Sequence, residues 1–275
     1  MLNKVRERLL YVDDGDLRDQ PSQIYHENSK VGRAFATFTR DETQTERMIA
    51  DLLSSVQGNR GRYPYCPSVP LAERTEGNGI SLRCALAARR SHRQVRDRPL
   101  SFEAFSSMLR GATEVTGKAD ITRTVSVPAR SYPSAGGLYP IQVYAVVRTV
   151  TGLESGCYYL DADSGHLHRL GDTPSGDSMV GTFLGDANAG VAPAIIVLTA
   201  VLNRSTIKYG ERAYRYCQIE AGHLGQNILL TALAHDIGAY PVGGFVESDI
   251  EDMLGVDGVE EIAVHSILLS DTSTD

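Results

Sequence analysis

The pattern of hydrophobic and polar positions changes near residue 80. Residues 1–80 are polar and end in a stretch of glycines and prolines that is typical of loops. Within them, Thr43–Val56 has apolar residues at helical spacing, which predicts one helix. We therefore expect residues 1–80 to form an N-terminal extension and residues 81–275 to form the main domain.

The sequence of the main domain predicts helices and strands in a mixed order. Helical patterns cover residues 81–91, Ser101–Ala112 with its serine N-cap candidate, Ala213–Asp236 closed by Gly238 and Pro241, and Ser248–Leu254. Strand patterns cover Ile141–Val150, Val191–Val201 and Glu261–Ser270, with a hairpin over Cys157–Leu170. Because strands and helices do not strictly alternate, the order favours an α+β fold over a doubly wound parallel sheet.

Charge and composition exclude several classes of function. The 275 residues contain 27 Lys and Arg against 34 Asp and Glu, giving a formal net charge of -7. This argues against sequence-independent binding of nucleic acid and against docking on an anionic membrane. A chain start without an apolar segment, and the absence of any apolar run of about 18 residues, predict a cytoplasmic protein.

Cysteine spacing and nucleotide motifs narrow the picture further. Four cysteines lie far apart with no Cys-x-x-Cys pair, so we expect neither a clustered-thiolate zinc site nor a disulfide scaffold. The glycine-rich fingerprints of dinucleotide-binding and P-loop proteins are also missing.

A basic cluster follows the first helix of the main domain. Arg89, Arg90, Ser91 and Arg93 place three guanidiniums and a hydroxyl within five residues. Arginine forks suit phosphate oxygens, so the cluster is a candidate phosphate site. A solvated basic face at a helix end is the plainer explanation.

Two glycine-containing segments could approach a flat ligand closely. In Ser131–Pro140, small side chains stand between two prolines just before a predicted strand. In Pro241–Phe245, two adjacent glycines follow the longest predicted helix. An ordinary tight turn and a helix stop are the alternative explanations.

Lys208 and Tyr209 stand side by side ahead of that helix. Their ordinary pKa values, roughly 10.4 and 10, make neither a base at neutral pH. A shift of about three units needs roughly 4 kcal/mol of differential interaction, which only a dry, organised pocket supplies. Both side chains reach one site only from a turn or a helix, because neighbours on a strand point to opposite faces.

The longest helix also carries polar residues on one face. Glu220 and His223 have the spacing of a di-iron ligand pair, but a second such motif is lacking. We therefore expect no metal site and a buried hydrogen-bonded pair instead. With Asn227 they predict a polar seam against another helix or a partner subunit.

Taken in order, RRSHR, PSAGGLYP before a strand, a long helix with EAGHLGQNILL, and PVGGF resemble the FMN-dependent nitroreductase superfamily. KYG-x-R-x-YR and the segment Ser22–Lys30 resemble more narrowly its SagB-type branch, which includes azoline dehydrogenases of peptide natural-product pathways. The resemblance implies an α+β fold with an antiparallel or mixed sheet flanked by helices. It also implies a homodimer that binds FMN at its interface with residues from both chains.

Carried over by position, the resemblance implies ten FMN-binding residues. Those at the phosphate and ribityl end are Arg89, Arg90, Ser91 and Arg93. Those against the isoalloxazine ring are Pro133, Ser134, Ala135 and Gly136. Those in the loop whose backbone N–H faces flavin N5 are Gly243 and Gly244. Lys208 and Tyr209 match the catalytic pair of azoline dehydrogenases.

The function that this resemblance implies is dehydrogenation of a thiazoline or oxazoline to the azole. Lys208 or Tyr209 would remove a proton while a hydride leaves to the flavin, and the sequence does not choose between the two bases. The substrate would be peptide-derived or carrier-bound, and a separate cyclodehydratase or synthetase would form the ring. Two alternatives remain, which are an NAD(P)H-dependent nitro or quinone reductase of the same fold and a flavin-free scaffold for a peptide-modifying complex.

Overall fold

The computed structural model describes residues 21–30, 62–120 and 126–272. The chain divides into two compact units, Met1–Glu42 and Thr43–Asp275. In the first unit the described element is helix α2 (Pro21–Asn28), which falls in the predicted SagB-like segment. The helix predicted over Thr43–Val56 lies outside the described residues.

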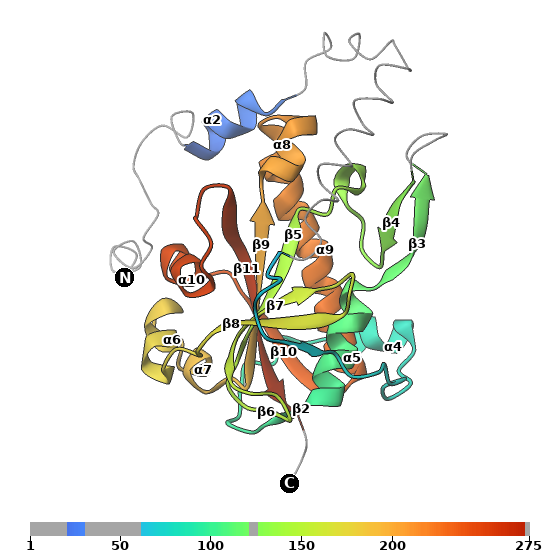
Figure 1. The fold of residues 1–275 in the computed structure, drawn as a ribbon, viewed down its shortest axis with the longest axis vertical. Helices are drawn as coiled ribbons and strands as arrows, with labels where there is room; N and C mark the ends of the chain where they lie inside the picture. Colours follow the sequence, from blue (N-terminus) through green and yellow to red (C-terminus); the bar gives the residue numbers. More distant parts are fainter. Residues whose placement is uncertain (1–20, 31–61, 121–125, 273–275) are drawn as a thin grey trace, which may run out of the picture. The chain divides into compact units, whose positions relative to one another are not determined.

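The second unit is built around a seven-stranded antiparallel sheet with the order β1-β8-β7-β5-β9-β11-β10 (Figure 1). Its strands are β1 (Ser68–Pro70), β5 (Ile141–Val147), β7 (Gly156–Asp161), β8 (His166–Gly171), β9 (Ala194–Val201), β10 (Ile237–Val242) and β11 (Glu261–Asp271). Two smaller pairs are β2 (Leu100–Ser101) with β6 (Val150–Thr151), and β3 (Val115–Asp120) with β4 (Ser126–Arg130). The α+β prediction is confirmed.

Helices cover both faces of this sheet. One core cluster joins the sheet to α5 (Phe102–Thr113) and α9 (Arg212–Ala234), and α4 (Leu82–Ala88) packs against α9. A second cluster joins the other face to α6 (Gly176–Thr182), α7 (Ala187–Val191) and α10 (Glu247–Leu254). Every residue of β5 and β9 is buried, as expected for strands that are covered on both faces.

Local sequence signals explain where several helices begin. The Ser101 hydroxyl accepts the Ala104 N–H at 3.1 Å, and the Ser81 hydroxyl accepts the Cys84 N–H in the same way at the start of α4. Such N-caps satisfy backbone donors that the first helical turn leaves free. Both predicted helices therefore start where the sequence places a serine.

The end of the longest helix differs from its prediction. Helix α9 ends at Ala234, two residues before the predicted end, and after a turn at His235 and Asp236 the chain forms strand β10, which was not predicted. Pro241 lies inside β10, opposite Ile267. Because β10 is an edge strand, a proline without an N–H is tolerated there, and the chain can continue as sheet.

Several further elements were not predicted from the sequence. Strand β1 pairs with β8, so part of the predicted extension contributes an edge strand to the main sheet. The β3–β4 hairpin, helices α6 and α7, and helix α8 (Asn203–Tyr209) were also not predicted. A domain boundary at residue 80 stays a prediction.

Candidate active site

The segment that leads into β5 forms a tight turn, here called the glycine turn (residues 133–140). Its centre is a short 3-10 helix, Ala135–Gly137, in which Gly136 has φ 65 and Gly137 has φ 66. L-residues rarely adopt this left-handed region, so glycine is the residue that this backbone needs. Ser134 closes the turn, since its hydroxyl accepts the Tyr139 N–H at 2.9 Å.

Lys208 and Tyr209 meet the glycine turn from the end of α8. A Cβ placed on Gly136 would lie 2.7 Å from Lys208 Nζ and 2.6 Å from the Tyr209 hydroxyl. The amine and the phenol are therefore close neighbours over one glycine. Both residues belong to a helix that Gly210 ends at φ 53, so adjacent side chains reach one site, as the sequence argument required.

Burial acts on these two groups in opposite directions. It lowers the pKa of the Lys208 amine and raises the pKa of the Tyr209 phenol, because each loses hydration of its charged form. The Tyr209 ring is held edge-on against Tyr216, with centroids 4.9 Å apart. Burial thus moves the amine toward its neutral form and keeps the phenol protonated.

Helix α9 supports the glycine turn from behind. Glu220 is 2% exposed, and its carboxyl accepts the Ser134 hydroxyl at 2.5 Å. Burial raises the pKa of Glu220 to about 7. Asn227 donates to the Ser131 carbonyl at 3.1 Å, which fastens the start of the same segment.

The predicted buried pair of Glu220 and His223 is wrong. His223 is exposed, whereas Glu220 is buried against Ser134. Residues three apart point in directions that differ by about 60° around a helix. Glu220 lies within the buried face of α9, whereas His223 lies just outside it. Glu220 and Asn227 instead both bind the segment that enters the glycine turn.

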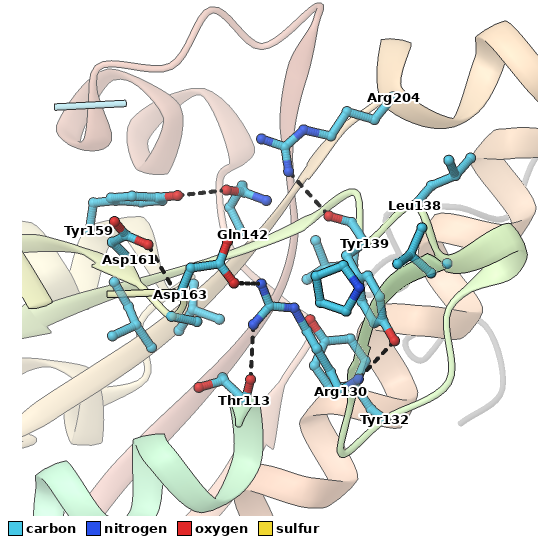
Figure 2. Close-up of a pocket in the computed structure, with 17 residues that line it drawn as sticks. Thr113, Arg130, Tyr132, Leu138, Tyr139, Gln142, Tyr159, Asp161, Asp163 and Arg204 are labelled. Carbon is cyan, nitrogen blue, oxygen red and sulfur yellow. Dashed lines mark hydrogen bonds and ion pairs between the residues drawn. The ribbon is translucent and has the colours of Figure 1, made fainter. Parts of the chain in front are cut away.

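A cavity of about 110 Å³ lies beside the glycine turn, between the β3–β4 hairpin and the start of β5 (Figure 2). Tyr139 links its walls, since its hydroxyl accepts the Arg130 N–H at 2.9 Å and its carbonyl accepts Arg204 at 3.2 Å. Arg130 also forms an ion pair with Asp163 at 2.6 Å. Tyr139 has φ 46, a strained value for a tyrosine that these contacts maintain.

The predicted phosphate residues form the basic segment (residues 89–93), which runs beside β10. The His92 N–H donates to the Ala239 carbonyl at 3.1 Å. The positive charge of Arg93 favours the ionised form of the nearby Tyr240 phenol. Arg89 and Ser91 are half-buried, and Arg93 is exposed. The Arg90 guanidinium donates to the carbonyls of Ala87 and Arg89, so it also ends helix α4.

The glycine pair, Gly243 and Gly244, follows the last residue of β10. Both glycines are exposed, and a Cβ on Gly243 would meet nothing within 4 Å. Tyr240 and Gly243 are three residues apart, so about 10 Å of extended chain separates the basic segment from the glycine pair. The basic segment and the glycine pair of one chain therefore both lie at strand β10.

The glycine turn lies at a different place on the sheet. Tyr240 pairs with Leu268, Leu268 with Ile195, and Ile195 with Val146. Val146 is five residues along β5 from Ile141, where the glycine turn ends, and β5 is three strands from β10. At about 3.3 Å per residue and about 4.8 Å between strands, the two regions are about 20 Å apart. The structure thus does not unite all the predicted site residues within one chain.

No metal site accompanies these groups within the described residues. Nowhere in residues 21–30, 62–120 or 126–272 do three or more His, Cys, Asp or Glu side chains gather closely enough to hold a metal ion. Across those same residues, no helix has both the length and the apolar character needed to cross a membrane.

Comparison with known proteins identifies the family. The Nitroreductase family matches residues 86–268, which is well over half of the chain. The chain belongs to the nitroreductase family. A nitroreductase-family relative from Methanocaldococcus jannaschii, named a nitroreductase, is 31% identical over 177 residues, covering 64% of this chain and 85% of the relative.

Three other similarities concern the fold and peptide processing. The trifolitoxin-processing protein TfxB of Rhizobium leguminosarum is 23% identical over 239 residues, covering 83% of this chain and 61% of TfxB. A nitroreductase structure from Anabaena variabilis has a TM-score of 0.71 at 21% identity, covering 96% of this chain and 49% of that one. A chain of the E. coli microcin synthetase McbBCD complex with truncated pro-MccB17 has a TM-score of 0.56 at 19% identity, covering 89% and 99%. This chain thus spans about half of the Anabaena protein.

Several residues around the site had no assigned role in the sequence analysis. Arg130, Tyr139 and Arg204 stabilise the glycine turn, and the bond from Arg204 to Tyr139 joins positions 65 residues apart. Glu220 was noted for its spacing, while its contact with Ser134 joins positions 86 residues apart. The one sequence signal for the role of Glu220 was its position as a polar residue on the apolar side of α9.

Proposed function

We propose that this nitroreductase-family protein is an FMN-dependent dehydrogenase that oxidises a thiazoline or oxazoline ring, in a peptide-derived or carrier-bound substrate, to the azole. The observation that carries this proposal is the meeting of Lys208 and Tyr209 at Gly136. Azole formation removes a proton and a hydride from adjacent ring atoms, so it needs a base. Reduction of a nitro compound or a quinone requires no such base.

Lys208 is the proton acceptor in this proposal. Its lowered pKa increases the fraction of neutral amine, whereas the raised pKa of Tyr209 keeps the phenol protonated. The Tyr209 hydroxyl can then donate a hydrogen bond to the ring nitrogen or the neighbouring carbonyl of the substrate. This division of roles assigns the base that the sequence left open.

The residues around β10 fit one end of FMN. Arg89, Ser91 and Arg93 supply charged and hydroxyl donors of the kind that phosphate requires, and the exposed glycine pair follows about 10 Å further along the chain. Arg90 adds a contact through its backbone while its side chain caps α4. When bound, FMN supplies the acceptor for the hydride, and molecular oxygen is the terminal oxidant.

The separation of the two regions supports a homodimer with composite sites. The ribityl chain of FMN is comparable to about three extended residues, roughly 10 Å, which is half of the distance between Tyr240 and the glycine turn. The ribityl chain alone therefore does not bridge a phosphate on Arg93 and the segment Pro133, Ser134, Ala135 and Gly136 of the same chain. Two copies remove this gap if one provides the basic segment and the glycine pair and the other provides the glycine turn with Lys208 and Tyr209.

The relatives support a peptide-linked substrate and a separate partner enzyme. TfxB is named for processing trifolitoxin, and the McbBCD structure is a synthetase complex with a pro-peptide bound. We infer that this chain likewise acts on a substrate whose azoline ring is formed by a separate cyclodehydratase or synthetase. The cytoplasmic location expected from the sequence belongs to the same proposal.

The test compares Lys208→Ala with the control Lys118→Ala, which removes an exposed lysine of β3. Both variants are loaded with FMN, mixed without oxygen with a synthetic thiazoline peptide, and followed by flavin absorbance and mass spectrometry. We expect Lys208→Ala to keep FMN but lose azole formation by at least about 100-fold, since a general base contributes at least that much. Equal azole formation by the two variants would refute the role of Lys208.

An NAD(P)H-dependent nitro or quinone reductase is the second candidate, because the relative from Methanocaldococcus jannaschii is named a nitroreductase. In that case a reduced nicotinamide would rapidly bleach the visible absorbance of the flavin, and a quinone would restore that absorbance. Lys208→Ala would have little effect on the rate of quinone reduction. A protein that cannot be loaded with FMN would support the scaffold alternative instead.

A further inference from the structure

Helix α9 is fastened to the glycine turn through Ser134. The Ser134 hydroxyl accepts the Tyr139 N–H at 2.9 Å and donates its one proton to Glu220 Oε2 at 2.5 Å. The first bond closes the turn on itself. The second holds the closed turn against a buried carboxyl of the helix.

Other polar groups surround Glu220 from several elements. They are Arg130 of β4, Arg204 of α8, Cys217 one turn earlier on α9, Tyr132 before the glycine turn, and the N–H of Ile141 at the start of β5. The two arginines and the amide favour the ionised carboxylate, whereas burial favours the neutral acid. Burial is the stronger influence.

We propose that Glu220 is a positioning residue that, through Ser134, holds the glycine turn against Lys208 and Tyr209. Gly136 lies two residues after Ser134, and both the Lys208 amine and the Tyr209 hydroxyl approach it closely. Movement of Ser134 away from Glu220 would therefore change the surroundings of both side chains. The catalytic consequence rests on the proposed function, but the positioning itself does not.

The ionised form of Glu220 holds the turn more tightly than the neutral form. A carboxylate accepts the Ser134 hydroxyl as a charge-assisted bond, which is stronger than a bond to a neutral acid. Glu220 Oε1 is buried without a hydrogen-bond partner among the described residues, so a proton there would lack an acceptor. Because the pKa of Glu220 is about 7, the turn tightens as the pH rises through neutrality.

The positioning is tested on FMN-free protein by the rate at which an amine-specific reagent acylates Lys208. The variants are Ser134→Ala, Glu220→Ala, Glu220→Gln and the double variant Ser134→Ala with Glu220→Ala, with Lys118 as the internal reference. We expect both single alanine variants to acylate Lys208 several-fold faster than wild type, and the double variant no faster than either. Glu220→Gln should acylate at a rate between wild type and the alanine variants, because its amide oxygen still accepts the Ser134 hydroxyl but without the charge of the carboxylate.

Unchanged acylation of Lys208 in Ser134→Ala, a small change that should fold, would overturn the inference whatever reaction the protein catalyses. Equal acceleration at Lys118 would also overturn it, because it would indicate general loosening. In FMN-loaded protein, the activity of wild type should rise through about pH 7, and Glu220→Gln should lack this rise. Glu261→Gln is the matched control, since Glu261 is a buried glutamate bonded to Tyr144 and Thr199 instead, and it should keep the wild-type pH profile.

Discussion

Replacing Gly136 with alanine tests the geometry of the site without removing any functional group. Gly136 has φ 65, where an L-residue costs about 1 kcal/mol relative to glycine. The new Cβ would lie 2.7 Å from Lys208 Nζ and 2.6 Å from the Tyr209 hydroxyl, whereas ordinary contacts begin at 3.4 Å. To reach ordinary contact, the Lys208 amine must therefore retreat by 0.7 Å and the Tyr209 hydroxyl by 0.8 Å.

Gly255→Ala is the matched control. Gly255 ends helix α10 with φ 69, nearly the same backbone strain, and its Cβ would meet nothing within 4 Å. Both variants should lose about 1 kcal/mol of unfolding free energy in urea titrations. Only Gly136→Ala should lose activity, by about 100-fold, because a misplacement of about 1 Å costs that much.

The assay is the initial rate of azole formation at saturating FMN, with FMN affinity measured separately. Separate measurement matters because the glycine turn is also proposed to contact the flavin ring. A folded Gly136→Ala variant with full FMN binding and wild-type rate would refute the reasoning, since Lys208 and Tyr209 would then not act from beside Gly136.

Three further predictions follow from the fold and the site. Because burial raises the pKa of Glu220 from 4.5 to about 7, the free energy of unfolding should fall by about 3 kcal/mol between about pH 4.5 and pH 7 and then level off, as the unfolded state releases its proton first. Urea titrations across this range should show a smaller fall for Glu220→Gln, and an equal fall would contradict the assignment. Ser101→Ala should lower the unfolding free energy by about 1 kcal/mol through loss of the α5 N-cap and leave activity unchanged; no loss of stability would mean that the cap is unimportant. Finally, inactive Lys208→Ala and Arg93→Ala homodimers, mixed to exchange subunits, should recover about a quarter of wild-type activity, because half of the dimers then hold one intact composite site. No recovery despite confirmed exchange would exclude the proposed sharing of residues.

Local patterns were sufficient for the central strands and several helices. Apolar spacing placed α4 and α5, the latter with a serine N-cap candidate, and continuous apolar runs placed β5 and β9, because each signal acts within a few residues. Strand β10 was not predicted, since the cost of Pro241 in a strand depends on whether the strand lies at an edge. That property belongs to the sheet and not to the local sequence.

The candidate site was predictable in parts and not as an arrangement. The glycine turn and Lys208 with Tyr209 were singled out separately, and the structure brings them together over Gly136. The bond from Ser134 to Glu220 was not predictable, because it joins a turn and a helix through tertiary packing. The distance between the basic segment and the glycine turn likewise follows from strand order, which no local pattern encodes.

The most direct test of the proposed function is an anaerobic single-turnover experiment with FMN-loaded protein and a synthetic thiazoline peptide. We predict that the peptide alone bleaches the visible flavin band, with one thiazole formed for each flavin reduced, and that NADH or NADPH bleaches it slowly or not at all. Rapid bleaching by a reduced nicotinamide, with no response to the thiazoline peptide, would contradict the proposal and indicate a reductase.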